Sequence, residues 1–172
     1  MVIVREKLAS CAAQAAGRLS LAFERRSRSR QRAMLDSGEE IGMVMPRGEV
    51  LRGGDWVLAA DGRAIEVVAE PERVLHVECE TPRALVAAAY HLGNRHVPVQ
   101  VGDAWLRIAY DHVLERMLLG MGAKLEVLDA PFEPEAGAYG AHHRHDNESG
   151  HGGRIHEFGL SPSSLGEGRG EG

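Results

Sequence analysis

The sequence predicts an α+β chain with a β-rich N-terminal domain, a ferredoxin-like βαββαβ domain and a flexible histidine-bearing tail. Three observations indicate this fold class. Short apolar stretches between glycine turns fill residues 1–71, strand and helix signals alternate over 72–139, and Gly, Ser, Glu and His dominate 140–172. The chain has 172 residues, 44% of them hydrophobic, which is enough for two compact modules with small cores.

The N-terminal region predicts a small β module, because short apolar runs alternate with Gly-containing turns. Asp61-Gly62 lies between two of these runs and is a two-residue hairpin signal. The alanine-rich stretch 8–16 favours a helix. The expected strands are residues 41–45, 55–59 and 64–69.

The second region is expected to open with a strand at 74–79 and a helix. Thr81 suits the N-cap position of that helix, and Pro82 suits its first turn. Residues 84–92 favour a helix, and we expect Gly93-Asn94 to close it as a C-cap pair.

Two strands, a helix and a last strand are expected to complete this region. Strands at 97–101 and 105–110 flank a Gly-Asp turn, and the last strand is expected at 124–128. Asp111 is expected to cap the second helix, which ends at one of the two following glycines, Gly120 or Gly122. The apolar side of this helix is expected to consist of Val113, Leu114, Met117 and Leu118.

Histidines are concentrated in the tail, where five of the nine fall within fifteen consecutive positions. Neutral imidazole binds zinc, copper, iron and nickel, and a flexible segment can fold several imidazoles around one ion. A purification tag is the alternative, but a tag is normally uninterrupted, whereas this tract contains charged residues. The candidate metal ligands are His142, His143, His145, His151 and His156.

His96 lies in a loop between the expected helix end and the next strand, where a ligand can be presented to solvent. A single surface histidine is weak evidence, but a two-fold dimer would bring two copies together around one ion. His112 begins the second helix and is either a further ligand or a solvated first-turn residue. His76 and His91 are interpreted as structural or solvated.

Several classes of protein are excluded or disfavoured. The net charge of −5 opposes non-specific nucleic-acid binding, and the basic run 25–32 is interpreted as a solvated face or a protein-docking patch. Cys11 and Cys79 form no C-x-x-C pair, which indicates reduced thiols. The chain shows no enzyme signature and no apolar stretch of about 20 residues, so we expect a non-enzymatic cytoplasmic protein that does not enter a membrane.

Three separated motifs resemble those of the urease accessory nickel chaperone family, UreE. They are residues 89–96, followed by Pro98 and Gln100; residues 110–114; and residues 131–139, just before the histidine-bearing tail. Residues 27–32 (Ser-Arg-Ser-Arg-Gln-Arg) and 52–55 (Arg-Gly-Gly-Asp) also resemble the same family, more loosely, so the resemblance covers most of the chain. Three motifs in the right order are more specific than any one of them.

The resemblance implies a dimer in which His96 is the principal Ni(II) ligand at the interface and tail histidines add further sites. His112 matches a secondary ligand, but Tyr110 stands where the family has a neighbouring histidine, which weakens that site. The implied function is delivery of nickel to the urease apoprotein together with a urease accessory GTPase. Metal linkage of dimers into a tetramer is left open.

Two other functions remain as alternatives from the residues alone. A general buffer for Zn(II), Cu(II) or Ni(II) would use the same imidazoles, since nitrogen donors do not select among these metals. An RNA-binding module shares the βαββαβ order, but residues 105–110 lack the required aromatic pattern.

Overall fold

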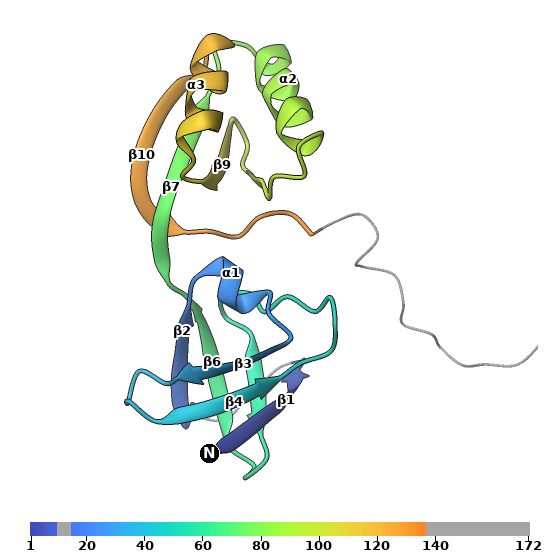
Figure 1. The fold of residues 1–172 in the computed structure, drawn as a ribbon, viewed down its shortest axis with the longest axis vertical. Coiled ribbons are helices and arrows are strands. Elements are labelled where there is room, and N and C mark those ends of the chain that lie inside the picture. Colours follow the sequence, from blue (N-terminus) through green and yellow to red (C-terminus); the bar gives the residue numbers. More distant parts are fainter. Residues whose placement is uncertain (10–14, 137–172) are drawn as a thin grey trace, which may run out of the picture. The chain divides into compact units, whose positions relative to one another are not determined.

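The N-terminal part of the chain forms one six-stranded sheet in a computed structural model that describes residues 1–9 and 15–136 (Figure 1). The strand order is β2-β6-β5-β1-β4-β3, with β1–β4 and β2–β6 parallel and the other pairs antiparallel. The Asp36 amide donates to the Arg18 carbonyl at 2.9 Å, so the segment after β3 approaches β2 and nearly closes the sheet. The elements are β1 (Val2–Leu8), β2 (Gly17–Leu21), α1 (Phe23–Arg26), β3 (Arg30–Met34), β4 (Glu40–Val44), β5 (Trp56–Ala59) and β6 (Ala64–Ala69).

Alternation of buried and exposed residues explains this sheet. In β5 and in the first four residues of β6 every second residue is buried, as expected for strands with one face on a core. The β5–β6 hairpin is confirmed, and Gly62 adopts the positive φ of 87° that its turn requires. The largest members of this core include Leu19, Leu21, Ile41, Met43, Leu51 and Ile65.

The prediction of a helix at 8–16 is wrong for the residues that the structure describes. Leu8 ends strand β1 and pairs with Trp56 of β5, while Ala9, Ala15 and Ala16 are not helical. Residues 10–14 lie outside the described part of the chain. Strand pairing outweighs the helix propensity of alanine here, because propensity is a weak preference compared with tertiary contacts.

The second part has the predicted βαββαβ order (Figure 1). Its four-stranded sheet has the order β10-β7-β9-β8, with antiparallel pairs throughout. Leu75, Val77, Leu106 and Ile108 form one core with both helices. The elements are β7 (Pro71–Glu78), α2 (Pro82–Gly93), β8 (Gln100–Val101), β9 (Trp105–Ala109), α3 (His112–Gly120) and β10 (Lys124–Pro131).

The predicted helix caps are confirmed, with two corrections nearby. The Thr81 hydroxyl accepts from the Ala84 amide at 3.2 Å, and Asp111 accepts from two amides at the start of α3. Val113 does not belong to the core, because it is 55% exposed. The strand expected at 97–101 pairs only at Gln100 and Val101.

No helix among residues 1–9 and 15–136 is long and apolar enough to cross a membrane.

Candidate metal-binding site

His96 lies at the C-terminal end of α2, in a left-handed backbone conformation with φ 56°. The Val97 amide donates to the Leu92 carbonyl at 3.2 Å, and the His96 amide donates to the Gly93 carbonyl at 2.9 Å. These two bonds form a Schellman motif, which ends a helix with one left-handed residue. The expected end of the helix at Gly93-Asn94 is confirmed, because Gly93 is the last helical residue and Asn94 is the C-cap, while the left-handed residue is His96, two positions further on.

The end of α3 supplies an internal comparison. The Ala123 amide donates to Leu118 and the Gly122 amide to Leu119, which is the same pair of bonds. The left-handed position there is Gly122, with φ 81°, whereas α2 places His96 at the equivalent position. His96 is the only non-glycine residue with positive φ in the described part of the chain. Left-handed backbone costs a histidine more than a glycine, and strain of this kind is concentrated at functional sites.

The motif presents the His96 side chain to solvent beside apolar surface. His96 is exposed, whereas Val97 packs with Leu92 in the core below. A cavity of about 520 Å³ is lined in part by His96, Val97, Pro98, Val99, Glu135 and Ala136. No group of three or more metal-ligating side chains occurs among residues 1–9 and 15–136, so His96 has no set of partner ligands within this part of one chain.

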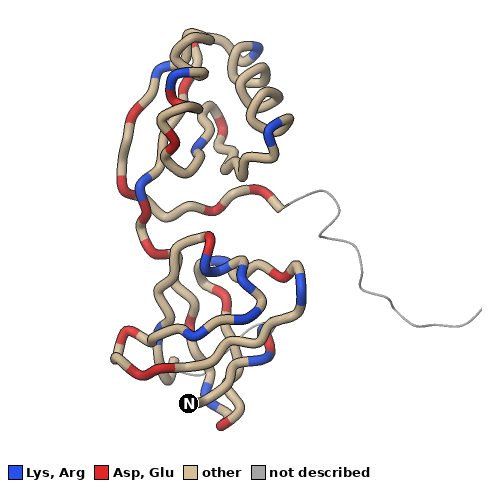
Figure 2. The backbone as a smooth tube through the Cα atoms, viewed as in Figure 1, with Lys and Arg blue, Asp and Glu red and all other residues tan. Residues whose placement is uncertain are grey.

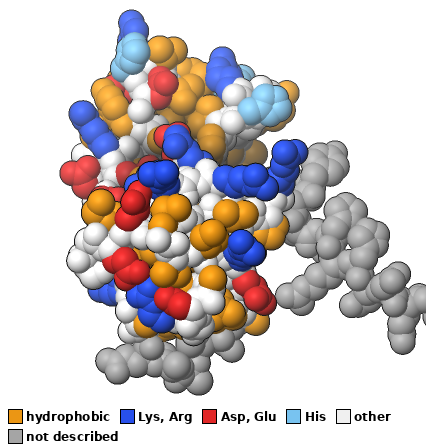
Figure 3. Space-filling view, turned by 60° about the horizontal axis from the view of Figure 1, so that its bottom comes forward, with side chains coloured by type: hydrophobic (Ala, Val, Ile, Leu, Met, Phe, Trp, Pro, Cys, Tyr) orange, Lys and Arg blue, Asp and Glu red, His pale blue; other side chains and the backbone are white. Residues whose placement is uncertain are grey.

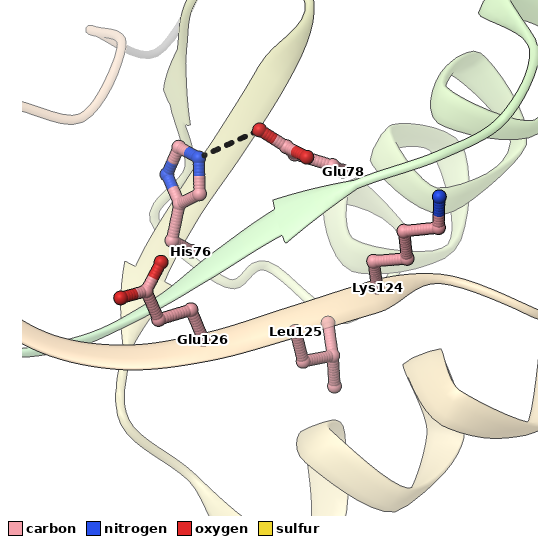
Figure 4. Close-up of a pocket in the computed structure, with 5 residues that line it drawn as sticks. All are labelled: His76, Glu78, Lys124, Leu125 and Glu126. Atoms are coloured by element: carbon pink, nitrogen blue, oxygen red, sulfur yellow. Dashed lines mark ion pairs between the residues drawn. The ribbon is translucent and has the colours of Figure 1, made fainter.

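The other three described histidines do not share the left-handed backbone of His96. His112 is the exposed first residue of α3, and His91 is exposed near the end of α2. His76 is half-buried in β7, where its Nδ1 accepts from Arg107 Nε at 3.2 Å and its Nε2 lies 3.5 Å from Glu78 (Figure 4). Both ring nitrogens of His76 are occupied by protein partners, which fits the structural interpretation.

The comparisons with known proteins cover both parts of the chain. Residues 3–70 match the family of the UreE urease accessory protein, N-terminal domain, and residues 72–159 match that of its C-terminal domain. The chain belongs to the UreE urease accessory protein family. Membership confirms the resemblance, the α+β fold class and the predicted function, a nickel chaperone for urease maturation rather than an enzyme.

Relatives named urease accessory protein UreE align over most of their length. One from Azotobacter vinelandii is 48% identical over 147 residues, covering 83% of this chain and 89% of the relative. One from Pseudomonas fluorescens is 45% identical over 165 residues, covering 93% and 99%. One from Cupriavidus necator is 52% identical over 134 residues, covering 78% and 70%.

The remaining candidate ligands of this UreE chain are not placed by the structure. The five tail histidines, His142, His143, His145, His151 and His156, lie outside the described residues. Histidine side chains of the described part reach the surface in Figure 3. Cys79 is half-buried, and burial raises the pKa of its thiol, which disfavours the thiolate that would bind a metal.

One group of polar residues in this UreE chain was not recognised from the sequence. The basic run around α1 (Figure 2) was interpreted as solvated or docking surface, but Arg26 is only 1% exposed. Its guanidinium donates to the carbonyls of Leu21 and Leu51 at 3.0 Å, to the Phe132 carbonyl at 2.5 Å and to Glu133 at 2.8 Å. The signal available in the sequence was the third motif, residues 131–139, whose glutamates offer partners of opposite charge to the basic run.

Proposed function

We propose that this chain carries Ni(II) for urease assembly by holding the ion between the His96 side chains of two copies of the protein. The observation that supports this most is the exposed, left-handed His96 at the end of α2. A rigid helix end fixes where the imidazole lies, and one exposed imidazole per chain becomes two on a two-fold axis. Two nitrogen donors leave coordination positions open, which suits an ion that must be passed on.

Apolar side chains near His96 support the homodimer. Val86 is 68% exposed and Tyr90 is 64% exposed, and they are four residues apart on one side of α2. Val101 in β8 is 53% exposed. Exposed apolar side chains on one side of α2 favour contact with another protein surface, and we assign a second copy of this chain to it.

We assign supporting roles to the remaining histidines and to the domains. His112 and the tail histidines His142, His143, His145, His151 and His156 supply accessory ligands. The division into residues 1–71, 72–139 and 140–172 separates a partner-docking domain, a metal-binding and dimerising domain, and the tail. The partners are the urease apoprotein complex and the urease accessory GTPase in the cytoplasm, without nucleic acid or membrane.

The left-handed backbone allows a sharp test of His96. His96→Gly removes the imidazole and also relieves the backbone, so the variant should lose the interface ion while its stability stays equal or rises by up to about 1 kcal/mol. His96→Ala should also lose the ion but gain no stability, because alanine keeps the strained φ that histidine already has. Calorimetric titration with nickel and thermal unfolding measure the two effects.

His91→Ala is the matched control, since His91 is exposed on the same helix and is not proposed as a primary ligand. It should bind nickel as the unaltered chain does. Unchanged nickel stoichiometry and affinity in His96→Gly would disprove the assignment. Parallel titrations with Zn(II) and Cu(II) test selectivity, and tighter copper binding is expected in vitro because nitrogen sites follow the Irving–Williams order.

A further inference from the structure

Two sequence motifs about 80 residues apart meet at one carboxylate, that of Glu133. Its Oε1 accepts from Arg26 Nη1 at 2.8 Å and from the Gly53 amide at 2.8 Å. Its Oε2 accepts from Arg52 Nη1 at 3.1 Å. Arg52 also donates to the Pro134 carbonyl at 2.6 Å, so the segment 132–136, which contains Glu133, is held by its backbone as well. Charge-assisted bonds of this kind are stronger and more directional than neutral ones.

Gly53 is part of this arrangement because a side chain there would be tightly crowded. A Cβ at this position would lie 3.2 Å from Glu133 Oε1 and 3.1 Å from the Ala69 Cβ. A side chain at residue 53 would therefore force Glu133 or Ala69 to move by a few tenths of an ångström, and glycine avoids this crowding. This explains the order Arg-Gly-Gly-Asp at 52–55, in which Arg52 and Gly53 bind Glu133 and Asp55 accepts from the Arg52 amide at 2.6 Å.

The same segment continues along the residues that follow His96. The Glu133 amide donates to Gln100 Oε1 at 3.1 Å, and the Glu135 amide donates to the Val99 carbonyl at 2.8 Å. Ala136, the last described residue, lines the same cavity as His96. Residue 142 follows Ala136 by six positions, so an extended chain can carry His142 at most about 20 Å from this point.

We propose that Glu133 is a positioning residue for nickel binding, because it fixes the place beside the His96 loop from which the histidine tail leaves. This inference rests on the proposed function of His96 and the tail. Fixing the root of the tail raises the effective concentration of its imidazoles near an ion at His96. Glu133 does not touch the metal, and its effect is transmitted through the segment 132–136.

The test uses the full-length chain and nickel alone. Glu133→Ala should weaken the apparent affinity for the interface ion by about twofold, because release of residues 133–136 lengthens the tether to His142 from about six to about ten residues and the effective concentration falls roughly as the −3/2 power of that length. In a full-length chain whose five tail histidines are alanine, the same substitution should have no effect on affinity. Equal affinity of Glu133→Ala and the unaltered chain, or an equal loss in both backgrounds, would overturn the proposal.

Glu135→Ala is the matched control, since Glu135 is exposed in the same segment and only its backbone amide makes a bond. It should bind nickel with unchanged affinity. Arg52→Ala is a milder variant in case Glu133→Ala does not fold, because Arg52 is 30% exposed and Arg26 would still hold the carboxylate. Arg52→Ala should also weaken nickel binding, and by a smaller factor.

A metal-free measurement separates this inference from the proposed function. Hydrogen exchange at the Gly53 and Glu133 amides should be slow in the unaltered chain, and Glu133→Ala should accelerate it at Gly53. Rapid exchange at Gly53 in the unaltered chain would mean that its amide is not bonded to Glu133, and the proposal would be overturned. If His96→Gly binds nickel normally, the proposed function fails, while the exchange result still decides whether Glu133 holds the segment.

Discussion

Single residues in this protein combine local structure with function. His96 ends a helix at a position where glycine is usual, and Gly122 fills that position in α3. Asp111 is a second example, because its Oδ1 accepts from the Val113 amide at 2.7 Å and from the Leu114 amide at 3.0 Å. His96 is itself exposed, and Asp111 directly precedes the exposed His112, so both residues combine a role at a helix terminus with a place at a candidate ligand.

Asp111 should make the stability of α3 sensitive to acid. Bonds from the backbone amides of Leu114 and Val113 lower the pKa of its carboxyl in the folded chain. A lowered folded pKa adds stability above the ordinary pKa of an aspartate, and that stability is lost as the pH falls through the folded pKa. Asp111→Asn keeps an acceptor without the charge, so its deficit relative to the unaltered chain should be present at pH 7 and shrink toward pH 3.

Chemical unfolding at the two pH values measures this deficit. Glu115→Gln on the same helix controls for the general loss of a negative charge. A deficit of Asp111→Asn that is the same at pH 7 and pH 3 would contradict a charge-dependent cap.

The elements of the second domain have distinct inner and outer faces. Ala88 and Leu92 of α2 are buried against the sheet, whereas Val86 and Tyr90 point away from this core and are exposed. The inner face holds the domain together without any partner. The outer face therefore remains available for the second copy that the proposed nickel site requires.

Val86→Asp should weaken dimerisation, because a carboxylate would be buried without a partner in the proposed interface. We expect mostly monomer by light scattering at micromolar concentration, together with at least tenfold weaker nickel binding at His96. Met34→Asp is the control, since Met34 is 60% exposed on β3 of the other domain. A Val86→Asp protein that remains dimeric with normal nickel binding would place the interface elsewhere.

At the scale of the whole molecule, the tail and the His96 site are expected to contribute different ions. All members of the buried cores lie between Val4 and Phe132, so ending the chain after Tyr139 removes no described core residue. The shortened chain should bind fewer nickel ions but keep one per dimer. Metal analysis after dialysis counts the ions, and complete loss would mean that the tail, not His96, is the primary site.

Local signals in the sequence were sufficient for most of the fold. Thr81, Asp111 and the Asp61-Gly62 turn determine caps and a hairpin through bonds to residues at most a few positions away. Alternating apolar residues then indicate which face of each strand is buried. For this reason the βαββαβ order, and the motifs that indicate the UreE family, were readable before any contact between distant residues was known.

Contacts between distant residues decided the rest. Arg26 and Glu133 are 107 positions apart, and nothing near either of them in the sequence predicts that they form a partly buried ion pair. Leu8 lies in an alanine-rich stretch but joins β1 through its pairing with Trp56. The sequence by itself determined the family, the βαββαβ elements of the second domain and the candidate ligand His96, but not the strands β1, β2 and β3. The left-handed backbone of His96 rests on bonds within its own helix end. Only the tertiary structure decided the place from which the tail leaves, because the bonds to Glu133 join residues 80 to 107 positions apart and form after the elements have packed.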